Sequence, residues 1–349
     1  RPLADGGEGT VEALVSGMNG TIRKVSVTGP IGKTVVCEYG VIENTDGKTG
    51  EKTEEKTAVI EIAKAAGLTL LSEEERNPLY TTTYGVGEVI KDAVRNGCRK
   101  FIVGIGGSAT NDGGAGMLQA LGFGLLKENG EQIPIGARGL EELAEITDDN
   151  VIPELAECKF KIACDVTNVL CGETGASAVY GPQKGADEEM TERLDRLLFS
   201  YASLVKKKIP KADSMYPGTG AAGGLGFAFL TFMDAQLESG IQIVIKETGL
   251  EQEIAKADLV ITGEGRMDGQ TAMGKAPIGI AKIAKKYGKP VIAFAGAAAR
   301  DAGACNEQGI DAFFPILREA VSLEAAMKRE NAEANMEAAV EQAYRLWRL

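Results

Sequence analysis

The sequence predicts an α/β fold with two domains, in which parallel strands are covered by helices on both faces. Short apolar runs typical of strands alternate with amphipathic helical segments along the chain, and this alternation is typical of parallel sheets. Glycine-rich loops follow several of the expected strands, as they do at the binding sites of open α/β sheets. The 349 residues are long for a single core and suit two domains.

The chain opens with an expected pair of strands. Residues 24–28 and 34–42 alternate or run apolar, and Gly29-Pro30 marks a turn between them. Residues 43–56 are polar and charged, so we expect a solvated hairpin loop there and no site. The later strands that we expect cover residues 57–62, 100–103, 159–163, 258–262, 290–295 and 312–317.

Helices are expected where apolar residues recur at helical spacing. Residues 85–96 show this spacing and are followed by Gly97, as a helix C-terminus would be. Residues 187–208 begin with acids and end with lysines, the order that the helix dipole favours. The remaining helices that we expect cover residues 277–287 and 322–347.

Composition excludes several classes of chemistry. The chain has no histidine, so Ser-His-Asp catalysis and histidine-ligated metals are excluded. Its six cysteines form no C-x-x-C pair, and we expect reduced thiols in a cytoplasmic protein. The net charge of -12 argues against a nucleic acid or an anionic membrane as partner.

Five glycine-rich loops are the most informative feature of the chain. Such loops bring backbone N–H groups close to a ligand, and when helices follow them they hold anions, above all phosphate. Most of these loops also carry acids, which suggests a bridging cation or proton transfer. The loops cover residues 4–10, 104–116, 181–185, 218–226 and 262–269.

The loop at 104–116 follows an expected strand. Its G-x-G-x-x-A start resembles a dinucleotide fingerprint, but the glycines that follow do not suit the start of a helix. We therefore expect a polar backbone cradle for phosphate rather than a nicotinamide site. Its candidate cofactor-binding residues are Gly106, Gly107, Ser108 and Thr110, and Asn111 and Asp112 follow them.

A second candidate region lies near residue 270. Residues 269–276 read G-x-x-x-x-G-K-A, which differs from a Walker A motif by the hydroxyl that would bind Mg²⁺. Lys275 therefore remains either an anion ligand or a solvated lysine. Glu264, Arg266 and Asp268 follow the expected strand at 258–262; Arg266 suits a carboxylate or phosphate, or it pairs with Asp268 to fix the loop.

Two further strand ends and loops carry candidate residues. Asp165 ends the expected strand at 159–163 and Asn168 lies nearby, and such oxygen donors suit Mg²⁺. Lys184 could neutralise a phosphoryl group during transfer, although Gly181-Pro182 could simply be a turn that carries a surface lysine.

Taken together, these residues resemble the bacterial type I glycerate kinases along essentially the whole chain. The motifs that carry the resemblance are Ala4-Asp-Gly-Gly-Glu-Gly-Thr10, Val27-Thr-Gly-Pro30, Gly104-Ile-Gly-Gly-Ser-Ala-Thr-Asn-Asp-Gly-Gly-Ala-Gly-Met117, Ala163-Cys-Asp-Val-Thr-Asn168, Gly175-Ala-Ser177, Gly181-Pro-Gln-Lys-Gly-Ala186, Gly220-Ala-Ala-Gly-Gly-Leu-Gly226, Leu259-Val-Ile-Thr-Gly-Glu-Gly-Arg266 and Gly274-Lys-Ala-Pro-Ile-Gly279.

The resemblance implies transfer of the γ-phosphate of ATP to a hydroxyl of D-glycerate, with 2-phosphoglycerate as the expected product and 3-phosphoglycerate as the variant outcome. It also implies a flavodoxin-like (Rossmann-like) parallel-sheet domain built from both chain ends, at residues 1–20 and 240–349, and an inserted α/β domain at residues 21–239. The substrates would lie in the cleft between them.

The sequence departs from the family pattern in three places. Family members begin with a strand, a loop of the form Ala-Pro-Asp-Ser-Phe/Tyr-Lys and a helix before the first motif found here, so we expect the first strand of that domain to be missing. Met273 stands where many relatives have histidine, so histidine cannot be required there. Ala297 replaces a common serine.

These observations give a working assignment of roles. Gly106–Thr110 and the loop at Gly220, Gly223 and Gly224 would hold the nucleotide phosphates. Asp165, with Asn168 or Glu264, would hold Mg²⁺, and Arg266 or Lys184 would clamp glycerate or the phosphoryl group. Asp112, and after it Asp268, would accept the proton of the attacking hydroxyl. The candidate substrate-binding residues are Asp5, Glu8 and Asn111.

Two other function classes stay open at this point. A nucleotide-cofactor oxidoreductase would share the fold class, but it would be expected to carry a closer match to the G-x-G-x-x-G dinucleotide fingerprint. A non-catalytic two-lobed binder of small molecules would need no carboxylate clusters. For the kinase, D-glycerate is the expected partner, and we leave a homodimer open.

Overall fold

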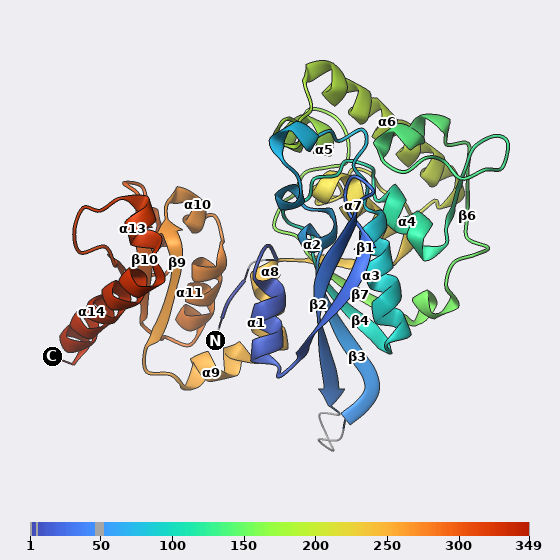
Figure 1. Ribbon diagram of the computed structural model, residues 1–349. Coiled ribbons are helices and arrows are strands. Elements are labelled where there is room, and N and C mark those ends of the chain that lie inside the picture. The colour runs from blue at the N-terminus through green and yellow to red at the C-terminus, as the bar shows by residue number, and fades with distance from the viewer. Residues whose placement is uncertain (1, 5, 46–51, 349) are drawn as a thin grey trace. The chain divides into compact units, whose positions relative to one another are not determined.

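The computed structural model describes residues 2–4, 6–45 and 52–348 and divides the chain into two compact units (Figure 1). The first unit comprises Arg1–Val244 and the second Ile245–Leu349. The division falls close to the expected boundary at 240. Residues 1–20, which we expected in one domain with the C-terminal part, group with the first unit; the flavodoxin-like assignment of the second unit stays a prediction.

The first unit is built on a six-stranded sheet with the order β1-β2-β3-β4-β7-β8. β1, β2 and β3 pair antiparallel, whereas β3, β4, β7 and β8 pair parallel. The sheet is therefore mixed, because the expected strand pair at its start forms a hairpin. Its strands are β1 (Thr21–Thr28), β2 (Thr34–Thr45), β3 (Lys52–Glu61), β4 (Cys98–Gly104), β7 (Lys159–Ala163) and β8 (Gln236–Glu238).

Alternating side chains of the central strands enter two separate cores. Ala58 and Ile60 of β3 join the larger core, whereas Val59 between them joins the smaller one. Helices α3 (Tyr84–Arg95) and α4 (Ala115–Leu121) pack on the larger core, and α1 (Thr10–Gly17) and the start of α8 (Gly240–Glu247) on the smaller one (Figure 1). Helices thus cover both faces of the sheet, as predicted.

Helix ends follow the sequence signals. α3 is followed by Gly97 at φ 85°, a conformation that glycine adopts without strain. α6 (Glu188–Lys208) begins after Asp187, whose carboxylate accepts a hydrogen bond from the N–H of Met190. The other elements of this unit are α2 (Ala63–Ala66), β5 (Gly124–Leu126), β6 (Glu145–Thr147), α5 (Ala176–Tyr180), α7 (Ala221–Phe232) and five short 3₁₀ helices.

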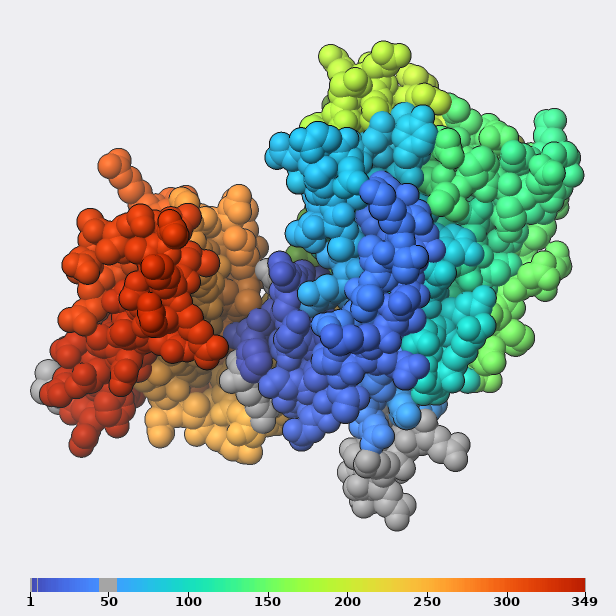
Figure 2. Space-filling view, in the orientation of Figure 1, coloured from blue at the N-terminus to red at the C-terminus, as the bar shows by residue number. Residues whose placement is uncertain are grey.

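β1 and β2 lie at the surface of the first unit (Figure 2). Ile22 of the edge strand β1 and Val36 of its neighbour β2 are both exposed there. None of the helices in the described part of the chain is long and apolar enough to cross a lipid bilayer.

The second unit contains a three-stranded parallel sheet with the order β11-β10-β9. Its elements are α9 (Leu250–Lys256), β9 (Val260–Met267), α10 (Gly269–Ala272), α11 (Ala276–Lys286), β10 (Val291–Ala298), α12 (Ala304–Glu307), β11 (Ala312–Pro315), α13 (Leu323–Met327) and α14 (Arg329–Trp347). The expected C-terminal helix is broken at Lys328, whose ψ of 128° is extended.

β9 continues where a loop was expected. β9 runs to Met267, and Thr262–Glu264, Arg266 and Met267 are paired with β10, so most of the fifth glycine-rich segment is strand. A Cβ at Gly263 would lie 2.3 Å from the carbonyl oxygen of Phe294. Here glycine allows close approach of two strands rather than a turn.

Candidate active site

A pocket of about 380 Å³ lies in the first unit, beside the carboxyl ends of β4 and β7. Ligands of open α/β sheets bind at such ends. Its wall includes segments from four of the predicted glycine-rich loops and the end of β7. The lining residues are Gly6, Gly7, Leu68, Ile105, Gly106, Gly107, Ser108, Ala163, Cys164, Asp165, Val166, Tyr180, Gln183, Lys184, Ala221 and Ala222.

Glycines allow the N-terminal loop to lie directly against the strand ends. Gly6 has φ 93°, and a Cβ there would lie 2.6 Å from the Cβ of Ala163. A Cβ at Gly104 would lie 2.4 Å from the carbonyl oxygen of Gly6. Any side chain at these positions would push the loop away from the sheet, so the glycines set the shape of the pocket wall.

Lys184 is a buried cation that lines this pocket. Its side chain is only 2% exposed, and its ammonium donates to Ser108 Oγ at 2.9 Å and to the carbonyl oxygen of Thr110 at 2.7 Å. Burial lowers the pKa of Lys184 to about 7, although the nearby charge of Asp112 acts in the opposite direction. A desolvated ammonium beside glycine-rich backbone is suited to bind an anion.

Asp112 does not line the pocket. It is fully buried, and its carboxylate accepts hydrogen bonds from Thr83 N and Thr83 Oγ1, both at 2.9 Å, and from the N–H groups of Gly114 and Gly116. Burial raises the pKa of Asp112. This arrangement holds the loop at 104–116 to the start of α3, and it does not suit the predicted role of proton acceptor from a ligand in the pocket.

The predicted cradle at 218–226 packs mainly against the neighbouring loop. Ala222, Gly223 and Gly224 all have left-handed backbone conformations. A Cβ at Gly223 would lie 2.0 Å from the carbonyl oxygen of Thr110, and the Gly223 carbonyl accepts from Gly113 N at 2.9 Å. A Cβ at Gly220 would lie 2.1 Å from a backbone oxygen. Ala221 and Ala222, rather than these three glycines, line the pocket.

Of the predicted metal ligands, Asp165 is placed at the pocket. Its side chain is exposed, and Oδ2 accepts from Gly240 N at 3.3 Å. The amide of Asn168 instead donates to Thr174 O and accepts from Tyr180 Oη. Its side chain therefore stabilises the loop between β7 and α5. Across residues 2–4, 6–45 and 52–348, no three acidic, cysteine or histidine side chains cluster closely enough to hold a metal ion.

Of the other predicted site residues in the first unit, two are fully buried and one is exposed. Thr110 and Asn111 are fully buried, and Thr110 Oγ1 and Asn111 Oδ1 have no hydrogen-bond partner among the described residues. The Asn111 amide donates to Ser177 Oγ at 2.9 Å. Glu8 is exposed, and Asp5 lies outside the described residues. Buried polar atoms without partners are sites where a water or ligand is expected.

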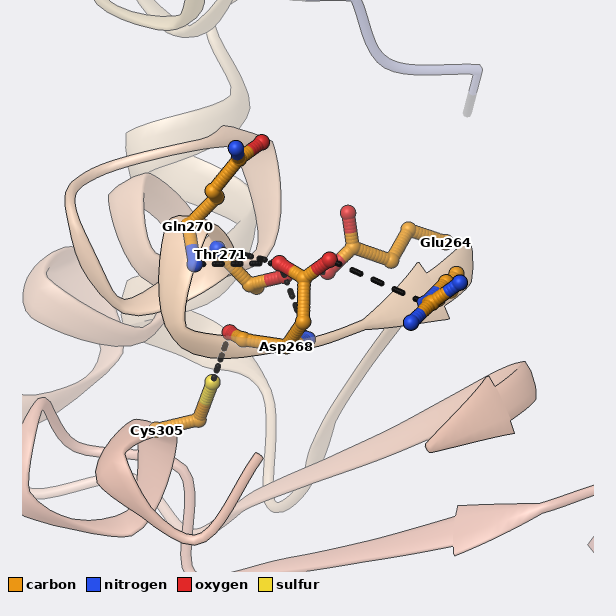
Figure 3. Close-up of polar contacts among 6 residues, drawn as sticks. Glu264, Asp268, Gln270, Thr271 and Cys305 are labelled. Atoms are coloured by element: carbon orange, nitrogen blue, oxygen red, sulfur yellow. Dashed lines mark hydrogen bonds and ion pairs between the residues drawn. The ribbon is translucent and has the colours of Figure 1, made fainter. Parts of the chain in front are cut away.

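The second unit brings its predicted acids together at the end of β9 (Figure 3). Thr271 Oγ1 donates to Glu264 Oε1 at 2.5 Å, and Asp268 Oδ1 accepts from the N–H groups of Gln270 and Thr271. Asp268 is thus the N-cap of α10, a structural role for this residue.

Two cations complete the predicted set in this unit. Arg266 Nε lies 3.8 Å from Asp268 Oδ2, with 70% of the arginine side chain exposed, so the guanidinium remains accessible to a ligand. Lys275 is half-buried and occupies the N-cap position of α11.

Comparisons with known proteins identify the chain. The sequence model of the glycerate kinase family matches residues 1–348. The chain belongs to the glycerate kinase family. It is 48% identical to a glycerate kinase of Halalkalibacterium halodurans (94% of this chain, 84% of the relative) and 48% identical to the glycerate 2-kinase of Escherichia coli K12 (94% and 83%). A crystal structure of a chain assigned as glycerate kinase 2 from Salmonella typhimurium LT2 matches with a TM-score of 0.84 at 47% identity, covering 98% of this chain and 87% of that one.

Membership in the glycerate kinase family confirms the resemblance seen in the sequence and identifies the chain as a kinase. The structure also shows no Walker A loop at the incomplete match, all of whose residues it describes. Residues 269–276 form the short helix α10 and the start of α11 rather than one continuous phosphate loop.

Sequence reasoning missed several residues of the pocket wall in this glycerate kinase family member. Tyr180, Leu68 and Ile105 line the pocket, but an apolar or aromatic residue between strands gives no signal of a site. Gln183 was detectable, since it precedes Lys184 within the glycine-rich loop at 181–185.

Proposed function

We propose that this protein transfers the γ-phosphate of ATP to a hydroxyl of D-glycerate and forms 2-phosphoglycerate, with 3-phosphoglycerate the less favoured product. The proposal is supported by family membership and by the relative named as a glycerate 2-kinase. The alternative classes, a nicotinamide or flavin oxidoreductase and a non-catalytic binder, lose their support with the family assignment.

The observation that carries the proposal is the position of Lys184 in the glycine-lined pocket. Phosphoryl transfer needs positioning and neutralisation of charge more than covalent chemistry by the protein. Lys184 offers a buried positive charge, Ser108 a hydroxyl beside it, and Gly106 and Gly107 backbone that a phosphate can approach closely. We assign the phosphate chain of the nucleotide to this wall of the pocket.

Mg²⁺ fits the pocket through Asp165. The ion usually takes one or two carboxylates and leaves its other positions to water and phosphate, so one exposed carboxylate in a phosphate pocket is a sufficient donor set. When bound, the ion would neutralise charge on the phosphates. Asp165 would hold it, while Asn168 supports the loop through its bonds to Thr174 and Tyr180.

The residues that contact glycerate and the residue that accepts its proton are candidates from both units. Among the described residues, Asp165 is the acid that lines the pocket of the first unit. In the second unit, Arg266 offers an exposed guanidinium suited to the glycerate carboxylate, and Asp268, Glu264 and Lys275 lie on the same segment. We keep Asp268 as a candidate base and give Asp112 a structural role.

A coupled assay of ADP release tests the function. We expect ADP release that requires both D-glycerate and Mg²⁺, and phosphorus NMR of the product distinguishes phosphorylation at the second carbon from that at the third. Absence of glycerate-dependent ADP release from the folded protein would overturn the proposal. A product phosphorylated at the third carbon would overturn only the assignment of the hydroxyl.

A further inference from the structure

Glu61 is a buried acid outside the pocket lining that the assigned roles do not use. It ends β3 and is paired in register with Gly104 of β4. Its side chain is 2% exposed, Oε1 accepts from Val11 N at 2.8 Å, and Oε2 has no hydrogen-bond partner among the described residues. Burial is the main cause that raises the pKa of Glu61, and the Val11 N–H opposes it. A carboxyl group in such surroundings is costly unless it performs a function.

The first turn of α1 needs an acceptor that its own sequence does not supply. The first N–H groups of any helix have no partner within the helix. The N-cap of α1 is Gly9, which has φ 90° and no side chain that could accept these bonds. Glu61 provides the missing acceptor from a neighbouring strand through its bond from Val11 N.

This cap is connected to the pocket through Thr10. Thr10 Oγ1 donates to the carbonyl oxygen of Gly7 at 2.7 Å, and Gly7 lines the pocket. On the other side of the same loop, the carbonyl oxygen of Gly6 lies against Gly104, the residue paired with Glu61. The loop formed by Gly6 and Gly7 is thus held at one end by the sheet and at the other by the start of α1.

We propose that Glu61 is a positioning residue for phosphoryl transfer: by holding the start of α1, it fixes through Thr10 the Gly6–Gly7 wall of the pocket. Glu61 touches neither substrate nor nucleotide, and the inference rests on the proposed function. Removing the acceptor loosens this wall, so binding at the wall weakens before the chemical step does. The KM of the substrate that contacts the wall therefore rises more than kcat falls.

The test compares four variants by steady-state kinetics. For Glu61→Ala we expect a KM about tenfold higher for ATP or for glycerate, with a smaller change in kcat, because loss of the hydrogen bond from Val11 loosens the wall. Glu61→Gln keeps an acceptor oxygen for Val11 and is expected to stay within about threefold of the wild type. Thr10→Val removes the hydroxyl that contacts Gly7 and is expected to raise the same KM.

Glu88→Ala is the matched control. Glu88 Oε2 also accepts a backbone hydrogen bond, from Thr28 N at 2.6 Å, but Glu88 does not line the pocket. Both alanine variants are expected to lower the melting temperature, whereas only Glu61→Ala changes KM. Hydrogen exchange at the Val11 amide gives a readout without activity, and we expect faster exchange in Glu61→Ala than in Glu88→Ala.

The outcomes separate this inference from the proposed function. A wild-type protein without glycerate-dependent ADP release refutes the function, while the exchange at Val11 still tests the cap. With an active wild type, unchanged KM values in Glu61→Ala, or an equal loss in Glu61→Gln and Glu61→Ala, would refute the inference. If Glu61→Ala does not fold, an unchanged KM in Thr10→Val refutes it instead.

Discussion

Lys184 and Ser108, which are 76 residues apart in the sequence, are joined by a 2.9 Å hydrogen bond from the lysine ammonium to the serine hydroxyl oxygen. Because the hydroxyl oxygen accepts from lysine, its own proton is free to be donated elsewhere. Both residues line the pocket, so the pair presents a positive charge and a hydroxyl donor at one place, as an anionic phosphate requires.

Replacing Lys184 with methionine should remove most of the activity. The change keeps a long side chain but deletes the positive charge beside the proposed phosphate site, and loss of one such group typically costs on the order of 10²–10³-fold in turnover. Steady-state ADP release measures the effect, with circular dichroism as the check on folding. A folded Lys184→Met variant that retains wild-type turnover would remove Lys184 from the mechanism.

Binding of ATP at pH 8 should be accompanied by proton uptake. With a pKa of about 7, Lys184 is mostly uncharged in the free protein at this pH, and phosphate anions beside it will raise its pKa and restore the proton. Titration calorimetry in two buffers of different ionisation enthalpy measures the uptake. We expect a buffer-dependent enthalpy for the wild type that is lost in Lys184→Met; equal dependence in both proteins would contradict this account of Lys184.

The same lowered pKa predicts how stability depends on pH. Between about pH 7 and the ordinary lysine value of 10.5, the unfolded chain binds a proton at Lys184 that the folded chain lacks, so the free energy of unfolding rises with pH across this window. Urea unfolding of the wild type minus Lys184→Met isolates the contribution. A difference between the two proteins that stays constant from pH 7 to 10 would show that burial does not shift this pKa.

Asp112 should affect stability more than catalysis. Asp112→Asn places an amide donor where the carboxylate accepts from Thr83, Gly114 and Gly116, and an unsatisfied buried group costs about 1–3 kcal/mol. We expect a clear loss in urea stability and a turnover that follows the folded fraction. A variant with wild-type stability and at least about 100-fold lower turnover would instead restore Asp112 as the base.

Gly223 should tolerate alanine much less than another glycine with similar φ. Gly223 has φ 67° and would bring a Cβ to 2.0 Å from Thr110 O, whereas Gly130 has φ 82° and nothing within 4 Å. Gly130→Ala therefore reports the backbone strain alone, about 1–2 kcal/mol, and Gly223→Ala adds a clash with the loop that accepts from Lys184. Equal stability losses in the two variants would show that this contact is unimportant.

The helix ends were predicted correctly because they depend on residues close by in the sequence. Asp187 marks a helix start because its carboxylate caps the first turn, and Gly97 marks a helix end because it adopts a positive φ without a Cβ. Both effects are independent of the tertiary context. β9 was predicted to end at Thr262 but continues to Met267. Gly263 there allows close contact with Phe294 on β10, and this contact depends on a partner strand distant in sequence.

The candidate site was predicted only in part, because the sequence does not show the direction that each side chain takes. The residue types and loops of Gly106, Ser108 and Lys184 led us to expect a phosphate pocket. The structure places all three on the wall of one pocket, and phosphate binding there stays a prediction. The same loop chemistry could not reveal that Asp112 faces Thr83 instead of the pocket, or that Glu61 caps α1. Both depend on which direction a side chain takes from an otherwise correctly predicted element.

The most direct test of the central claim is a crystal structure of the protein with Mg²⁺ and a non-hydrolysable ATP analogue. The account predicts a phosphate oxygen within hydrogen-bond distance of Lys184 Nζ, beside the backbone of Gly106 and Gly107. Phosphates bound elsewhere, with Lys184 still contacting only Ser108 and Thr110, would contradict it.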